Sequence, residues 1–337
     1  MANRHIQLAD ILEGLADSIG SRLAIVAGDS RRTYAELDDR ATRLANHLAA
    51  QGVGSGDHVG VHATNCIEWI ETFYACFKIR AVPVNINYRY VEAELRYLYS
   101  NSDCIAVVVA AEFVDSVEAV HDAFGELRHQ LVIGPDYESA LEAASPERDF
   151  AERSEDDIYI VYTGGTTGLP KGVLWRHEDL VLGALNSYRF GAPLASVTDL
   201  VEEVIEKDPM SLMMMGPFMH GGSQWAMGNV HMVGGSFVLY CEPRFDALRV
   251  LEIASETDVN TLSVIGDAMG KPIADLLLGP DAPDMDLSSL FAIANGAAPL
   301  TPAVRHPTQE FLCKALAVLA VPPTGVEQPG GDRDEQE

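Results

Sequence analysis

Positive charge is scarce in this sequence. Its 337 residues include 23 lysines and arginines against 50 aspartates and glutamates, a formal net charge of −27. A surface of this sign repels nucleic-acid backbones and anionic lipid headgroups, so we expect neither as a main partner. Any phosphate site must therefore create its own local positive potential. Each lysine in such a site contributes more to phosphate binding than it would in a basic protein.

Cysteine and long apolar runs are also scarce. We expect reduced thiols in a cytoplasmic protein, and neither a disulfide framework nor a zinc cluster. No run reaches the roughly 18 apolar residues of a membrane-spanning helix. The start of the chain is amphipathic and interrupted by charges, unlike a signal peptide. The five cysteines are odd in number, scattered, and mostly inside apolar segments: Cys66, Cys76, Cys104, Cys241 and Cys313.

Segments typical of strands alternate with segments typical of helices. A helix is predicted over residues 33–52, where Thr33 and Glu36 form a capping box ahead of one apolar face. This alternation predicts a layered α/β fold with a mainly parallel sheet. Residues 111–153 are polar and less regular, and residues 196–209 read as an acidic surface insertion. The other predicted strands span 57–63, 81–85, 104–110, 261–265 and 290–294, and the other predicted helices span 65–79, 92–101 and 245–255.

The strongest motif is a segment rich in glycine and threonine. Residues 162–172 read YTGGTTGLPKG and follow residues 158–161, which we predict to be a buried strand. Glycines let the backbone approach an anion, threonine hydroxyls bind phosphate oxygens or magnesium, and Lys171 adds positive charge. The spacing is neither a Walker A loop, because Pro170 precedes Lys171, nor a Rossmann loop. The segment predicts a phosphate-binding loop of another kind.

This loop resembles the signature of the adenylate-forming (AMP-binding) enzymes, which include acyl- and aryl-CoA ligases, luciferases and peptide-synthetase adenylation domains. Every position fits the family pattern Tyr-Thr-(Ser/Gly)-Gly-Thr-(Thr/Ser)-Gly-x-Pro-Lys-Gly. The resemblance implies ATP, Mg²⁺ and CoA, a small-molecule carboxylic acid as substrate, and a layered αβαβα N-terminal domain with mainly parallel sheets. It makes Thr163 a magnesium ligand as well as a phosphate ligand. The residues that it assigns to ATP are Thr163, Gly164, Gly165, Thr166, Thr167, Gly168 and Lys171.

The N-terminal part of the chain resembles the same family. Residues 33–103 fit its usual order of helix, strand, helix and a Pro-x-Asn-x-x-Tyr-Arg motif, here residues 83–89. One departure lies at Ile79 and Arg80, where members often carry Ala-Gly. We expect a reshaped helix end at that point.

Three further segments extend the resemblance to the acyl pocket and to the adenine site. Residues 217–222, PFMHGG, resemble the motif that borders the acyl pocket, so we expect His220, Gly221 and Gly222 to line it. A histidine beside glycines can donate a hydrogen bond near the substrate carboxylate, although a core histidine satisfied by the backbone remains an alternative. Gly266 and Met269 are expected in the same pocket. The turn that packs on adenine is matched by Asn295, Gly296, Ala297, Ala298 and Pro299.

Methionines gather in the sequence around this histidine. They suit either an adaptable pocket for a lipid-like acyl group or a plain methionine-rich core. Residues 175–179 and 261–272 narrow the resemblance to actinobacterial fatty-acid and steroid side-chain CoA ligases. By resemblance, the catalytic residues are Thr163, Lys171 and His220.

The resemblance covers residues 8–304 and then stops. Residues 305–337 have the composition of a disordered end. We expect a C-terminally truncated member: residues 1–304 form a partial AMP-binding domain, residues 305–337 form a divergent tail, and the C-terminal lid domain is absent.

The predicted function is that of an ATP-dependent acyl-CoA ligase for a fatty or steroid-derived acid, impaired by truncation. Two alternatives remain at this stage. One is an aryl-acid ligase or another adenylation enzyme, and the other is an inactive nucleotide-binding remnant. The sequence gives no indication of the oligomeric state.

Overall fold

The computed structural model describes residues 6–164, 168–186, 189, 194–280, 282, 284–306 and 308–309. The described helices are α1 (Leu8–Ile19), α2 (Tyr34–Ala50), α3 (Ile67–Lys78), α4 (Glu92–Ser102), α5 (Val114–Glu118), α6 (Pro135–Ala143), α7 (His177–Gly183), α8 (Val197–Ile205), α9 (Gly221–His231), α10 (Ala247–Glu256) and α11 (Gly266–Leu278), with short 3-10 turns η1 (Ala111–Phe113) and η2 (His121–Ala123). The described strands are β1 (Leu23–Ala27), β2 (Ser30–Thr33), β3 (His58–His62), β4 (Val82–Asn85), β5 (Cys104–Ala110), β6 (His129–Ile133), β7 (Ile158–Thr163), β8 (Lys171–Arg176), β9 (Ser211–Met214), β10 (Ser236–Leu239), β11 (Thr261–Val264) and β12 (Ala292–Asn295). The α/β class expected from the sequence is confirmed.

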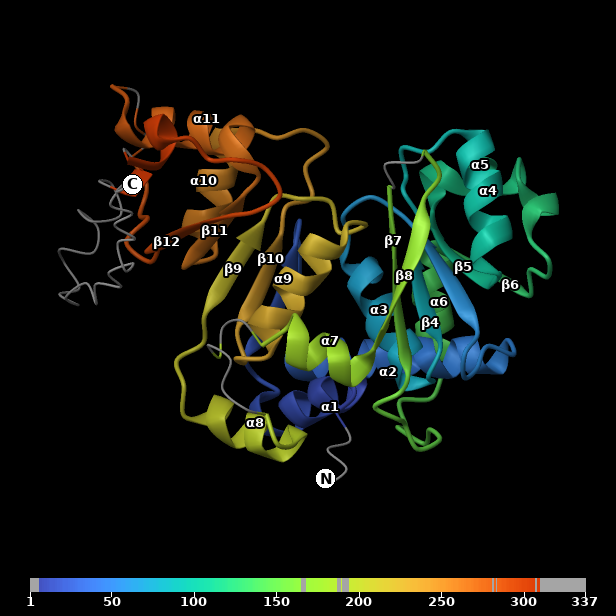
Figure 1. The fold of residues 1–337 in the computed structure, drawn as a ribbon. Helices are drawn as coiled ribbons and strands as arrows, with labels where there is room; N and C mark the ends of the chain where they lie inside the picture. Colours follow the sequence, from blue (N-terminus) through green and yellow to red (C-terminus); the bar gives the residue numbers. More distant parts are fainter. Residues whose placement is uncertain are drawn as a thin grey trace, which may run out of the picture.

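Two mainly parallel sheets organise these elements. The six-stranded sheet has the order β12-β11-β9-β10-β1-β2, in which only the edge strand β2 runs antiparallel. The four-stranded sheet has the order β4-β3-β5-β6 and is parallel throughout. Figure 1 shows the two sheets at opposite ends of the molecule. A separate antiparallel hairpin pairs β7 with β8.

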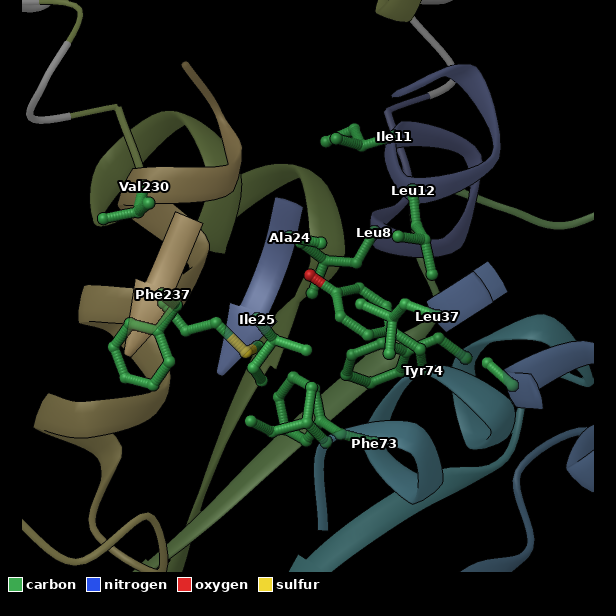
Figure 2. Close-up of a cluster of buried hydrophobic side chains, with 14 of the residues drawn as sticks. Leu8, Ile11, Leu12, Ala24, Ile25, Leu37, Phe73, Tyr74, Val230 and Phe237 are labelled. Atoms are coloured by element: carbon green, nitrogen blue, oxygen red, sulfur yellow. The ribbon is translucent and has the colours of Figure 1, made fainter. Parts of the chain in front are cut away.

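Helices α2 and α3 lie between the two sheets. Leu37 of α2 and Phe73 of α3 belong to a buried cluster that reaches Ile25 of β1 and Phe237 of β10, in the six-stranded sheet (Figure 2). The opposite sides of the same helices bury Leu44, Leu48 and Ala75 against strands β3, β5 and β6 of the four-stranded sheet. This shared apolar layer fixes the position of one sheet relative to the other.

Most sequence-based boundaries agree with the structure. The predicted helices and strands named above lie within two residues of α2, β3, α3, β4, α4, β5, α10, β11 and β12. The capping box of α2 is present, because Thr33 Oγ1 accepts from the Glu36 N–H and Glu36 accepts from the Thr33 N–H.

Two polar segments hold more structure than their composition indicates. The stretch expected to be irregular, residues 111–153, contains β6 and α6, and β6 extends the four-stranded sheet at its edge. The presumed insertion at 196–209 contains α8, whose Leu200 and Val204 are buried. Helix α8 packs closely on α1, since a Cβ added at Gly14 would lie 3.0 Å from Val201 Cγ2. The sequence indicated none of these three elements, because only one side of each is apolar.

The departure at Ile79 and Arg80 does not reshape the helix end as expected, because the Arg80 N–H still donates to the Phe77 carbonyl and the Ala81 N–H to the Cys76 carbonyl, as in a regular helix terminus. Arg80 follows α3 with a φ of 62°, a left-handed conformation that favours glycine. Its guanidinium forms an ion pair with Asp157 at 2.8 Å. This contact stabilises the residue in a conformation that an arginine seldom adopts.

Ion pairs hold the irregular segment 144–157, which links α6 to β7. Arg148 lies 2.6 Å from Asp38 of α2, and Arg153 lies 2.6 Å from Asp10 of α1. Lys78, fully buried, joins the same network through Asp38 at 2.6 Å and Glu13 at 2.7 Å. Although burial opposes ionisation of Glu13, Lys78 and Arg153 keep its pKa below the ordinary value.

The described cysteines Cys66, Cys76, Cys104 and Cys241 are free thiols, and Cys313 lies outside the described residues. Within the described ranges, no helix is long and apolar enough to cross a membrane. The same part of the chain contains no group of three metal-binding side chains.

Candidate functional site

The β7–β8 hairpin carries the predicted phosphate loop at its open end. Thr163, the last residue of β7, lies directly across from Lys171, the first residue of β8. Both are exposed, as are Gly164 and Gly168, and Gly168 has a φ of 99°. Lys171 forms no ion pair with any described residue, which leaves its charge available to an anion. Gly165, Thr166 and Thr167 lie outside the described residues.

Asn85 joins this hairpin to the turn before His220. Its Nδ2 donates to the Tyr162 carbonyl at 2.9 Å and to the Met219 carbonyl at 2.7 Å. Its Oδ1 accepts from the Tyr162 N–H at 2.7 Å. Asn85 is 5% exposed, so these bonds form out of water. Thr163 directly follows Tyr162, and His220 directly follows Met219. The hydrogen bonds from Asn85 to Tyr162 and Met219 therefore bring Thr163 and His220 into the same region.

A second asparagine supports the same turn. Asn65, between β3 and α3, accepts from the Phe218 N–H at 2.7 Å and donates to the Tyr240 carbonyl at 2.8 Å. Its Nδ2 also approaches the Gly216 carbonyl at 3.4 Å. The turn 216–220 is thus fixed by two side-chain amides, one after β3 and one at the end of β4 of the four-stranded sheet.

His220 occupies the N-cap position of α9 and is exposed. Partial burial and the nearby positive charge of Arg89 lower the pKa of the imidazole. The ring is therefore neutral at pH 7 and can donate or accept a hydrogen bond. Gly221 packs against β7, where a Cβ would lie 3.1 Å from Val161 Cγ2, whereas Gly222 faces open space.

The predicted adenine turn follows β12 and contacts the start of α11. Asn295 Oδ1 accepts from the Gly266 N–H at 2.8 Å, and Asn295 Nδ2 donates to the Ala298 carbonyl at 2.9 Å. Gly266 has a φ of 60°, and a Cβ there would lie 2.8 Å from the Ala298 Cβ. Gly296 and Ala297 are exposed. The turn therefore presents a surface of small residues at the carboxyl ends of β11 and β12, the edge where parallel sheets bind ligands.

Gly216 connects the histidine turn to this second part of the site. A Cβ at Gly216 would lie 3.3 Å from Ile265 Cδ1, and Ile265 precedes Gly266. The segments that carry Thr163, His220, Gly266 and Asn295 to Pro299 thus form a continuous series of contacts. The structure brings together predicted residues that are far apart in the sequence.

Five methionines near His220 in the sequence divide between two core clusters. Met214, Met227 and Met232 lie in the cluster around α1–α3, whereas Met213 and Met215 lie in a second cluster beneath α10 and α11. Met269, expected in the acyl pocket, is half-buried and packs on that second cluster. The burial of these side chains favours a methionine-rich core, and the pocket role of Met269 stays a prediction.

The sequence did not single out Asn65 and Asn85. Asn85 does lie in the Pro-x-Asn-x-x-Tyr-Arg motif, so the motif could have marked it as a candidate. Its role was hidden because its hydrogen-bond partners are 77 and 134 residues away in the sequence. Tyr162 adds a further anchor, since its hydroxyl donates to Asn101 Oδ1 at 3.0 Å and burial raises its pKa to about 12.

Comparison with known proteins agrees with this geometry. Residues 15–320 match a family described as AMP-binding enzyme. The 3-oxocholest-4-en-26-oate–CoA ligase of Rhodococcus rhodochrous is 39% identical over 317 residues, covering 89% of this chain and 57% of that protein. A medium/long-chain-fatty-acid–CoA/3-oxocholest-4-en-26-oate–CoA ligase of Mycobacterium marinum is 40% identical over 325 residues, covering 91% of this chain and 58% of that protein. The chain thus spans less than three fifths of the length of these curated relatives.

A solved structure shows the same fold. The N-terminal domain of FACL13 from Mycobacterium tuberculosis matches with a TM-score of 0.78 at 25% identity, covering 90% of this chain and 73% of that one. The expected resemblance to actinobacterial fatty-acid and steroid side-chain CoA ligases is confirmed by the sequence relatives. The family match covers nearly the whole chain, and this protein therefore belongs to the AMP-binding enzyme family.

Proposed function

We propose that this chain provides the ATP- and acid-binding part of an ATP-dependent acyl-CoA ligase for a fatty or steroid-derived acid. The observation that supports it best is the Asn85 link, which holds the end of the phosphate-loop strand beside the turn of His220. The names of the relatives support the substrate class. Residues 1–304 are proposed as the AMP-binding domain, and a cytoplasmic location is proposed from the free thiols.

The reaction requires two anions to meet. A carboxylate oxygen attacks the α-phosphorus of ATP, the bond to the β-phosphate oxygen breaks, and pyrophosphate leaves. Lys171 and the backbone of the loop offset the charge on the departing phosphates, and neutral His220 orients the carboxylate by a hydrogen bond. The thiol of CoA then displaces AMP from the acyl-adenylate to give the thioester.

Thr163 fits a magnesium ion as one ligand among several. Its exposed hydroxyl lies at the open end of the hairpin opposite Lys171. Mg²⁺ in nucleotide sites keeps several waters and binds phosphate oxygens, so a single protein hydroxyl suits it. The ion supplies further positive charge to the phosphates when it is bound.

Calorimetry with ATP and Mg²⁺ tests the nucleotide site. We expect binding by the unmodified chain and at least tenfold weaker binding by Lys171→Ala, because the variant lacks the free cation at the loop. Lys207→Ala is the matched control, since Lys207 is also exposed but lies on the surface beside Glu203. Equal affinity of the two variants would contradict the proposal, and absence of binding by all three proteins would favour the inactive remnant.

Pyrophosphate exchange with a panel of acids tests the substrate class. We expect exchange that depends on medium-chain, long-chain or steroid side-chain acids. Exchange supported by aryl acids alone would establish the aryl-acid alternative instead.

A further inference from the structure

Two histidines meet at the surface between α2 and β6, outside the site described above. His47 lies in the last turn of α2 and His129 is the first residue of β6. Their Nε2 atoms are 2.9 Å apart, with ring centroids 4.9 Å apart and ring planes inclined by 58°. Both side chains are partly exposed, so dissolved ions can reach them.

This nitrogen–nitrogen separation matches that of two ligands on one metal ion. Bonds from imidazole nitrogen to Zn²⁺ are about 2.0–2.1 Å long, so two such nitrogens are about 2.9 Å apart at a right angle and about 3.4 Å apart at a tetrahedral angle. An ion could therefore replace the proton that the two rings share with only a small movement of either ring. Imidazole pairs of this kind suit Zn²⁺, Ni²⁺ and Cu²⁺.

The charge state of the pair also suits a metal ion. Burial lowers the pKa of His47, and burial together with the neighbouring His47 lowers the pKa of His129. Both rings are consequently neutral at pH 7, which is the form that binds metals. The net charge of −27 attracts cations to the molecule as a whole.

The backbones that carry the two rings are held in place by apolar packing. Leu44 and Leu48 flank His47 on α2, and Leu131 follows His129 on β6; all three are buried in one cluster. The rings are therefore presented from two fixed elements, as a preformed metal site requires.

We propose that His47 and His129 form a two-histidine site for a divalent first-row transition metal, with water completing the coordination. Within the described residues no third histidine, cysteine, aspartate or glutamate joins them. A site with two protein ligands exchanges its ion readily, so its occupancy follows the concentration of free metal. When occupied, it cross-links α2 to the edge strand of the four-stranded sheet.

Calorimetric titration of the chain with Ni²⁺ at pH 7.5 tests the site. We expect binding that weakens at least tenfold in His47→Gln and in His129→Gln. His121→Gln is the matched control, because His121 is exposed on η2 and lies outside the pair. Equal Ni²⁺ affinity in the unmodified chain and in both pair variants would overturn the proposal.

A second measurement avoids any effect of substitution on folding. Paramagnetic Ni²⁺ added in small amounts to the unmodified protein should broaden the imidazole signals of His47 and His129 before those of the other histidines. Broadening that begins elsewhere, with the two signals unchanged, would also overturn the proposal. Neither experiment depends on ATP or on an acid substrate.

Discussion

At the residue scale, Asn85 determines how two parts of the site meet. An amide at this position can donate and accept at the same time, and both functions are used across three segments of the chain. A buried carbonyl or N–H that loses its partner costs about 1–3 kcal/mol. The identity of this side chain therefore affects both stability and the position of the loop.

We expect Asn85→Ala to lower the free energy of unfolding by about 1–3 kcal/mol, because it leaves buried backbone groups of Tyr162 and Met219 unpaired. ATP affinity should fall as well, since β7 and the histidine turn lose their common anchor. Urea unfolding and calorimetry measure the two effects.

Asn87→Ala provides the local control. Asn87 is less buried than Asn85, and its side chain accepts from the nearby Arg89 N–H. A stability loss in Asn85→Ala no greater than that in Asn87→Ala would show that the buried bonds have little effect.

The sequence singled out the charged residues and glycines of the candidate site, but not the amides that hold them. Lys171, the loop glycines and His220 stand in short motifs whose residue types indicate their chemistry. Asn65 and Asn85 act on segments more than 75 residues away, and only the folded chain brings those segments together. Local patterns cannot reveal such contacts.

At the element scale, the turn after β12 depends on a glycine at the start of α11. Gly266 combines a left-handed backbone with close contact to Ala298 and Pro299. Both features exclude a side chain, so the two segments can approach only if this residue is glycine.

We expect Gly266→Ala to lower stability by about 1–3 kcal/mol, through backbone strain and displacement of the 295–299 turn. Gly296→Ala is the control in the same turn, because a Cβ there meets no atom within 4 Å. Urea midpoints of the two variants give the comparison. Similar midpoints would mean that the turn adapts to the added methyl group.

Helix α2 could be predicted from its residues, and strand β6 could not. Helix α2 has a capping box and one buried side, so its limits follow from the sequence. Strand β6 pairs on one side only and has a single buried residue, Leu131. Its residues lack the continuous apolar pattern that identified β5.

At the scale of the whole molecule, three buried histidines make stability depend on pH. Burial lowers the pKa of His62, His177 and His231 to about 4 in each case. In the unfolded chain their pKa returns to about 6.5. The unfolded state therefore binds more protons than the folded state between these values, and stability falls as the pH falls through this interval.

We expect the urea midpoint to decrease steadily from pH 6.5 to pH 4.5, each histidine contributing up to about 1.4 kcal/mol per pH unit. His231→Gln should reduce the slope by removing one of the three groups. A midpoint that stays constant over this range would contradict the assignment of these residues as buried neutral bases.

The division into two sheets could not be foreseen from the chain. Alternating strands and helices indicated the α/β class, but β1 near the N-terminus pairs with β10, more than 200 residues later. Strand order depends on such distant pairings and on the apolar layer between the sheets. The sequence patterns describe each element without specifying its neighbours.

Charge and apolar packing together fix the path of the segment 144–157, since Phe150 packs against the buried cluster between α2 and the four-stranded sheet. Arg148 and Arg153 hold it against α1 and α2, while the α2–α3 layer joins the two sheets independently of it. Continuity of the chain at this point therefore contributes little to the association of the sheets. The molecule should therefore tolerate a break in the chain within this segment without coming apart.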